Sequence, residues 1–295
     1  MVNKFLFIGS GSPSDPGFDD VRLEYHDGSK LDRIPYREFM KARGITVVDK
    51  IIESCHGCYD LMSSYSHQME TLHESPDTRV VVVLQGGLLF GLPSIQATQT
   101  SFPIISCPTD FIAYSAFMVP SGHAVVAGVG VEKKGAQTQR EKALLLAERI
   151  LNLDHTQVNA VADLKTSSKL VEKLKSYGLR SVNGFGEGYI SPGMCLVYGG
   201  PDELKGVPEG CFAIRADSDE DVNSWAYMGL AEDRHNLAQY NRVPTAQVRG
   251  MDNLAIFAAK VISCQDKTLI GKIRGIGEKK RASYAERNLL KELQK

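Results

Sequence analysis

Short apolar runs alternate with helical patterns along the first half of the chain, and this alternation constrains the fold more than any other feature. The runs lie at residues 5–8, 46–52, 80–84, 103–106 and 124–129. Continuous runs rich in Val and Ile are typical of strands that are buried on both faces. Amphipathic stretches such as 60–72 and 137–151 supply helices. The pattern predicts an α/β fold in which helices cover both faces of a parallel sheet.

The second half repeats this pattern in a shorter form. Its β-rich runs lie at residues 158–162, 180–185, 194–198, 211–216 and 245–248, and its helical stretches at 167–177 and 251–262. Both halves contain a double glycine followed by Gly-aliphatic-Pro, and their closing helical segments, 141–150 and 252–261, align without gaps. The shared order favours a tandem duplication, with one unit at 1–155 and a second, shortened unit at 156–295. The alternative is the general similarity of α/β repeats.

Composition excludes several classes of protein. The chain has 295 residues, of which 43% are hydrophobic and 23% charged, as in globular rather than disordered proteins. Its net charge of -1 provides no overall field toward nucleic acid or an anionic membrane, so we expect neither as a partner. No segment approaches the roughly 18 apolar residues of a membrane span. We find no signal-peptide pattern, and therefore expect a cytoplasmic protein whose cysteines remain thiols.

Three loops that follow the first three strands are candidates for a ligand site. Residues 9–15 read Gly-Ser-Gly-Ser-Pro-Ser-Asp, and such a loop can bind a phosphate through its N–H and hydroxyl groups. The second loop, 53–60, follows the second strand, and the third, 85–93, begins Gln-Gly-Gly. Because ligands bind outside the carboxyl ends of the strands in open α/β sheets, we expect the three loops to form one site.

These loops are similar to those of the aminoimidazole ribonucleotide carboxylases and carboxyaminoimidazole ribonucleotide mutases, the PurE family. That family has a Gly-Ser-x-Ser-Asp loop, a Ser-Ala-His-Arg-Thr loop and a Gly-Gly-rich loop at these places. The resemblance covers residues 3–155 and, again, about 245–287. It implies a flavodoxin-like fold and a ribonucleotide substrate, with neither a metal nor an organic cofactor. The implied activity is that of a lyase or isomerase of purine biosynthesis, which moves a carboxylate to or from the imidazole ring.

The resemblance also implies roles for particular residues. His56 falls on the histidine that carries a proton in the family. The implied substrate-binding residues are Ser10, Ser12, Ser14, Asp15, Ser54, Gly86, Gly87 and Leu89. The three serines of the first loop remain alternatives for one family position, because two extra residues blur the register. Since the family forms octamers, a chain with two units is expected to form a homotetramer in which the C-terminal helices reach a neighbouring chain.

Some residues depart from the family pattern and support other functions. Gly57 stands where the family has an arginine, and Leu89 or Phe90 lies where a second histidine is common. The chain also has an insertion between Asp15 and Ser54. The missing arginine and second histidine favour a non-catalytic nucleotide-binding or assembly protein, and carboxylation-type chemistry on another nucleotide is a third alternative.

Two further segments allow more than one interpretation. Cys55 and Cys58 flank His56 in a C-x-x-C pattern, which suits part of a nucleotide site, two small buried thiols beside a functional histidine, or a redox pair. A metal site is less favoured, because no second C-x-x-C or His cluster completes four ligands. The basic tail, 271–295, predicts a solvated or interface helix.

Overall fold

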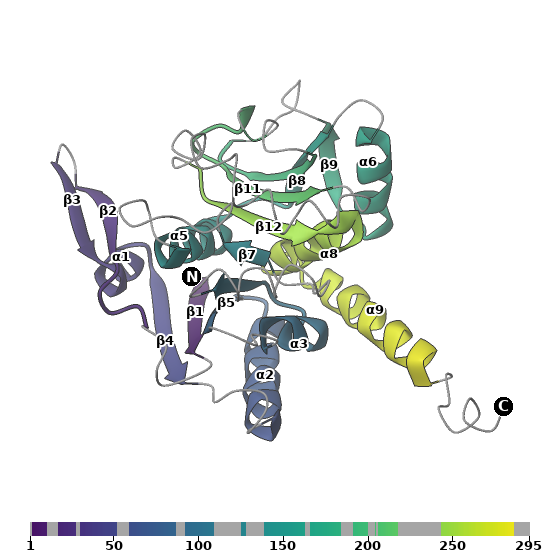
Figure 1. Cartoon of the computed structure of the whole chain (residues 1–295), viewed down its shortest axis with the longest axis horizontal. Helices are drawn as coiled ribbons and strands as arrows, with labels where there is room; N and C mark the ends of the chain where they lie inside the picture. The colour runs from purple at the N-terminus through teal and green to yellow at the C-terminus, as the bar shows by residue number, and fades with distance from the viewer. Residues whose placement is uncertain are drawn as a thin grey trace.

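The computed structural model of the chain shows an α/β fold (Figure 1). It describes residues 2–10, 17–27, 30–51, 59–86, 92–108, 125–127, 139–162, 166–183, 191–199, 204, 206–217 and 243–285. These residues form one ten-stranded sheet and a separate two-stranded hairpin. The α/β class and the parallel strands predicted from the sequence are confirmed.

The first half contributes five strands to the large sheet. They are β1 (Asn3–Ser10), β4 (Ile45–Ile51), β5 (Thr78–Gly86), β6 (Ile104–Pro108) and β7 (Val125–Ala127). The accompanying helices are α1 (Tyr36–Ala42), α2 (Tyr59–Glu74), α3 (Leu92–Gln99) and α5 (Gln139–Asn152). Each predicted apolar run overlaps one of these strands.

The second half contributes five more strands. They are β8 (Gln157–Ala162), β9 (Arg180–Asn183), β10 (Met194–Tyr198), β11 (Phe212–Asp217) and β12 (Thr245–Arg249). The helices are α6 (Ser167–Ser176), α8 (Gly250–Ser263) and α9 (Thr268–Ala285). The boundary that we placed after residue 155 falls in the connection between α5 and β8. Figure 1 shows α9 extending away from the sheet toward the C-terminus.

The two halves meet edge to edge within the same sheet. The strand order is β4-β1-β5-β6-β7-β12-β11-β10-β8-β9. Neighbouring strands are parallel within each half, whereas β7 and β12 pair antiparallel, with Val126 opposite Gln247. Within each half the strands lie in the order 2-1-3-4-5 of their own sequence, which is compatible with a flavodoxin-like sheet.

One apolar core extends through both halves. It includes Leu6 and Val83 from the first half and Leu196 and Ile214 from the second, all fully buried. Helices α1, α5, α6 and α8 contribute side chains to this core. A smaller cluster in the second half packs β10 and β11 against Leu204 and Val207. The shared core and the continuous sheet explain why the chain buries β-rich runs of both halves.

A β-hairpin occupies much of the insertion between Asp15 and Ser54, and we did not predict it. Its strands are β2 (Arg22–Asp27) and β3 (Lys30–Pro35), which pair antiparallel. The sequence offers a signal, because Gly-Ser at 28–29, between the paired residues Asp27 and Lys30, is a dipeptide typical of two-residue hairpin turns. The charged residues of both strands obscure it. Figure 1 shows the hairpin projecting from the end of the molecule opposite α9.

Within the described part of the chain, no helix combines the length and the apolar composition that a membrane span requires.

Candidate functional site

The carboxyl ends of β1, β5 and β6 form the sheet edge at which we expected the ligand site. Ser10 ends β1 and lies in register with Gln85 of β5, and Gly86 lies in register with Pro108 of β6. Ser10 and Gly86 are therefore strand residues, although we expected them in turns. The reason is that Ser10 is paired on both sides, with Ile51 as well as Gln85.

Most of the predicted site residues lie outside the described residues. These are Ser12, Ser14, Asp15, Ser54, His56, Gly87 and Leu89, together with the pair Cys55 and Cys58. The structure thus places only Ser10 and Gly86, and it brings both to the same edge of the sheet.

Gln85 connects the end of β5 to the residue that follows the first loop. Its side-chain Oε1 accepts a hydrogen bond of 2.9 Å from the backbone N–H of Gly17. Because Ser10 lies beside Gln85 in the sheet, both flanks of the segment 11–16 are held next to the same residue. Gly17 has φ +66°, a conformation that glycine adopts without strain.

Arg140 in the first turn of α5 holds the other side of Gly17. Its Nη1 donates a hydrogen bond of 2.8 Å to the Gly17 carbonyl, and its Nη2 donates one of 2.8 Å to Asp20 Oδ2. The hydrogen bond from Arg140 lowers the pKa of the Asp20 carboxyl. These contacts bring the N-terminal turn of α5 to the carboxyl edge of the sheet, where the positive end of the helix dipole favours an anion.

The hairpin is attached to the same turn of α5. Arg33 of β3 donates a hydrogen bond of 2.7 Å to Glu141 Oε1, and another of 2.8 Å to the Arg22 carbonyl. The inserted hairpin therefore supports the first turn of α5 on the side next to Arg140.

Gln85, Gly17 and Arg140 were not among the predicted site residues, although the third candidate loop begins at Gln85. Gln85 carried a signal in the sequence, because it is a polar residue directly after the apolar run Val80–Leu84. The structure shows that it is fully buried. The other two carried none that we can identify. Their roles depend on contacts with residues that are distant in sequence.

A second group of polar residues, all buried except the partly exposed Arg274, joins α2 and α3 to α8 and α9. We call it the polar junction; its members are Glu70, His73, Ser101, Lys260, Ser263 and Arg274. Glu70 Oε2 accepts hydrogen bonds from Ser101 Oγ at 2.8 Å and from Arg274 Nη2 at 2.6 Å. His73 Nε2 lies 3.0 Å from Ser263 Oγ. The polar junction links the two halves at a distance from the carboxyl edge of the first.

Burial changes the ionisation of two bases in the polar junction. Lys260 is fully buried, and burial lowers its pKa to about 7, against the opposing effect of Glu70. Its Nζ donates a hydrogen bond of 2.5 Å to the Ala97 carbonyl. Burial also lowers the pKa of His73 well below its usual value, with further contributions from Lys267, Arg274 and Lys260. The His73 ring is therefore neutral at neutral pH.

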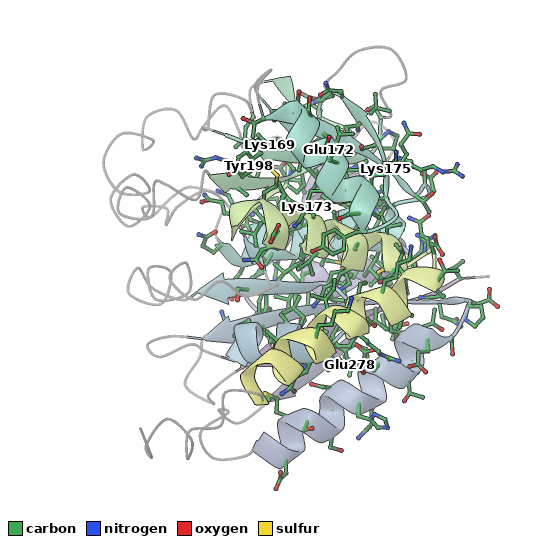
Figure 2. The ribbon with its side chains drawn as sticks, turned by 90° about the vertical axis from the view of Figure 1, so that its right-hand side faces the viewer. Lys169, Glu172, Lys173, Lys175, Tyr198 and Glu278 are labelled. Carbon is green, nitrogen blue, oxygen red and sulfur yellow. The ribbon has the colours of Figure 1, made fainter. Side chains whose placement is uncertain are left out.

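The outer surface of α6 carries charges of both signs. Figure 2 shows Lys169, Glu172, Lys173 and Lys175 on this helix, with Glu278 on α9 below it. Lys173 forms an ion pair of 2.5 Å with Asp252 of α8, and this contact raises the pKa of Lys173. The ion pair fastens α6 to the first turn of α8.

The second half has a buried cation at its own carboxyl edge. Arg215 of β11 is 5% exposed, and its Nε donates a hydrogen bond of 2.9 Å to the Gly199 carbonyl. Gly199 directly follows β10. This edge therefore also places a polar group where the strands end.

Neither a metal site nor a known relative identifies the chemistry. The described ranges contain no group of three His, Cys, Asp or Glu residues placed to hold a metal ion. Searches for a matching protein-family model and for a matching curated protein find none.

Proposed function

We propose that the protein is a carboxylase or carboxylate mutase that acts on aminoimidazole ribonucleotide in purine biosynthesis. The observation that carries the proposal is the arrangement around Gln85, where Ser10 and Gly17 meet at the carboxyl ends of β1 and β5. Open α/β sheets bind ligands at such an edge. The N-terminal turn of α5 adds a preference for an anion such as a phosphate. The resemblance of the three loops to the PurE family supplies the substrate and the reaction.

The proposed mechanism assigns proton transfer to His56. When a carboxylate is added, a new carbon–carbon bond forms at the electron-rich ring carbon and the proton on that carbon must leave. When the carboxylate is removed, a proton returns to the same carbon. A histidine suits this role, because its unperturbed pKa of about 6.5 lets it accept and donate a proton near neutral pH.

His56→Asn tests this role, because asparagine is similar in size and polarity but carries no proton at neutral pH. We expect kcat to fall by roughly 10²–10⁴, with little change in nucleotide affinity. Turnover is measured with aminoimidazole ribonucleotide plus bicarbonate for the carboxylase reaction, and with carboxyaminoimidazole ribonucleotide alone for the mutase reaction. His67→Asn, on the exposed side of α2, is the matched control. Unchanged turnover in His56→Asn would remove this residue from the mechanism.

Two alternatives keep the nucleotide site but change the activity. Gly57 in place of the family arginine favours a protein that binds a nucleotide without catalysis. Thermal stabilisation by a panel of ribonucleotides, measured beside turnover, separates the alternatives. Stabilisation without turnover supports the binding protein, and turnover of a different ribonucleotide supports carboxylation-type chemistry on that substrate.

We also propose that the fold is flavodoxin-like and duplicated in tandem. Support comes from the strand order, which is 2-1-3-4-5 in each half, and from the ordered matches of glycines and closing helices in the sequence. Helices α5 and α8 follow the fifth strand of their respective halves.

A further inference from the structure

Gln85 occupies an unusual position for an amide side chain. It is fully buried at the end of β5, directly before Gly86. Side chains alternate along a strand, and Val81 and Val83 belong to the main core, so Gln85 points to that same face. Leu6 and Ile8 place Ser10 on this face by the same argument. Ser10 and Gln85 are therefore neighbours on one face of the sheet edge.

Gly17 fixes the orientation of the Gln85 amide. The backbone N–H of Gly17 needs an acceptor, and in this side chain only Oε1 can accept. The amide nitrogen, Nε2, must then point elsewhere. It is buried and has no hydrogen-bond partner among the described residues. Leaving a buried donor unpaired costs free energy, so such a donor calls for a specific explanation.

We infer that Gln85 is a substrate-binding residue, whose Nε2 donates a hydrogen bond to a phosphate oxygen of a ribonucleotide at this edge. Ser10 offers a hydroxyl beside it. Two neighbouring strands thus present hydrogen-bond donors to one anion. The inference rests on the proposed nucleotide site, but not on the carboxylation reaction.

The alternative is a purely structural role, in which Gln85 serves only as an anchor for Gly17, that is, as the acceptor of its backbone hydrogen bond. Arg140 separates the two roles, because it holds the same glycine through the carbonyl and leaves Nε2 untouched. Gln85→Met removes both the anchor and the donor, whereas Arg140→Met removes an anchor only. Ser106→Ala is a further control. It removes a buried hydroxyl on β6 that also lacks a partner within the described ranges, and this side chain points to the opposite face from Ile105 and Cys107 of the main core.

The experiment measures binding by titration calorimetry on the full chain. The probes are aminoimidazole carboxamide ribonucleotide and the corresponding riboside, which lacks the phosphate. We expect Gln85→Met to weaken ribonucleotide binding by at least tenfold, Arg140→Met by less than threefold and Ser106→Ala not at all. Riboside binding should be the same in Gln85→Met as in the wild type. Equal losses in Gln85→Met and Arg140→Met would overturn the inference, as would unchanged affinity in Gln85→Met.

Gln85→Glu provides a second test if the methionine variant does not fold. Its carboxylate keeps an acceptor for Gly17 and repels a phosphate, so ribonucleotide binding should be lost while the fold is retained. Normal binding by this variant would overturn the inference. Turnover of aminoimidazole ribonucleotide is measured on the same samples. Wild-type binding without turnover, together with loss of binding in the Gln85 variants, supports Gln85 and rejects the carboxylase. Turnover by the wild type, together with unchanged ribonucleotide affinity in the Gln85 variants, supports the carboxylase and rejects the role of Gln85.

Discussion

Lys260 carries an amino group that solvent does not reach, and burial lowers its pKa from 10.5 to about 7. Glu70 partly opposes this shift, and the positive charges of Lys267 and Arg274 lie in the same region. Below pH 7 the amino group is protonated in both the folded and the unfolded chain. Between pH 7 and 10.5 the unfolded chain binds a proton that the folded chain does not. The free energy of unfolding should therefore rise with pH in this window.

We predict that Lys260 contributes up to about 1.4 kcal/mol per pH unit to this rise. The slope should be measured between pH 7 and 9. Burial raises the pKa of the Cys264 thiol from 9.0 to about 11, so above pH 9 the unfolded chain loses a proton that the folded chain keeps, and the free energy of unfolding falls. Urea unfolding at several pH values tests the slope in the wild type and in Lys260→Met, where it should flatten. Lys175→Met, on the exposed surface of α6, is the control and should keep the slope. An unchanged slope in Lys260→Met would contradict the prediction.

Among the secondary-structure elements, α9 is held against α2 by ion pairs of Arg274. The Arg274 guanidinium bonds Glu70, whose side chain is 9% exposed, and Glu74, whose side chain is 48% exposed. Removing a partner from a buried charge costs more than removing an exposed partner. We predict that Glu74→Gln lowers the free energy of unfolding by less than about 1 kcal/mol.

The matched variant is Arg274→Met, which keeps the apolar stem and leaves Glu70 with Ser101 as its remaining partner in the polar junction. We expect a loss of about 1–3 kcal/mol, the cost of a buried group that loses a hydrogen bond. Urea unfolding midpoints of the two variants test the difference. Equal effects would show that α9 is held by its apolar contacts rather than by Glu70.

The elements were predictable where burial alone determines them. The run Val80–Leu84 is apolar on both sides, so it predicts a strand whatever surrounds it. The hairpin strands were missed because they have one exposed face and many charges. Residue 260 looked like an ordinary helical lysine, since its burial depends on α3 of the other half.

The sequence predicted which edge of the sheet holds the candidate site, but it did not predict the hydrogen bonds within that site. The strand ends identified the edge, and Ser10 and Gly86 lie there. The bonds from Gly17 to Gln85 and Arg140 connect residues separated by 68 and 123 positions. No local pattern encodes contacts of that range, nor the pairing of β7 with β12.

At the scale of the whole molecule, we predict a homotetramer. The family to which the sequence is similar forms octamers of single units, and four chains of two units would supply the same eight. Multi-angle light scattering at micromolar concentration should give four times the mass of one chain. A monomer mass would reject this assembly. Helix α9 buries Leu269, Ile270 and Ile273 near its start against its own chain, so contacts to a neighbour would fall to its outer surface.

The antiparallel pairing of β7 and β12 also determines the direction in which the carboxyl ends of the strands point in each half. All strands within a half point the same way, so the two sets of carboxyl ends lie at opposite edges of the sheet. Ser10 and Gln85 lie at one edge and Arg215 at the other. A small ligand held at the first edge is thus separated from the second by the length of the strands. Two ligands on one chain would face away from each other, and a product released at one edge would reach the other only through bulk solvent.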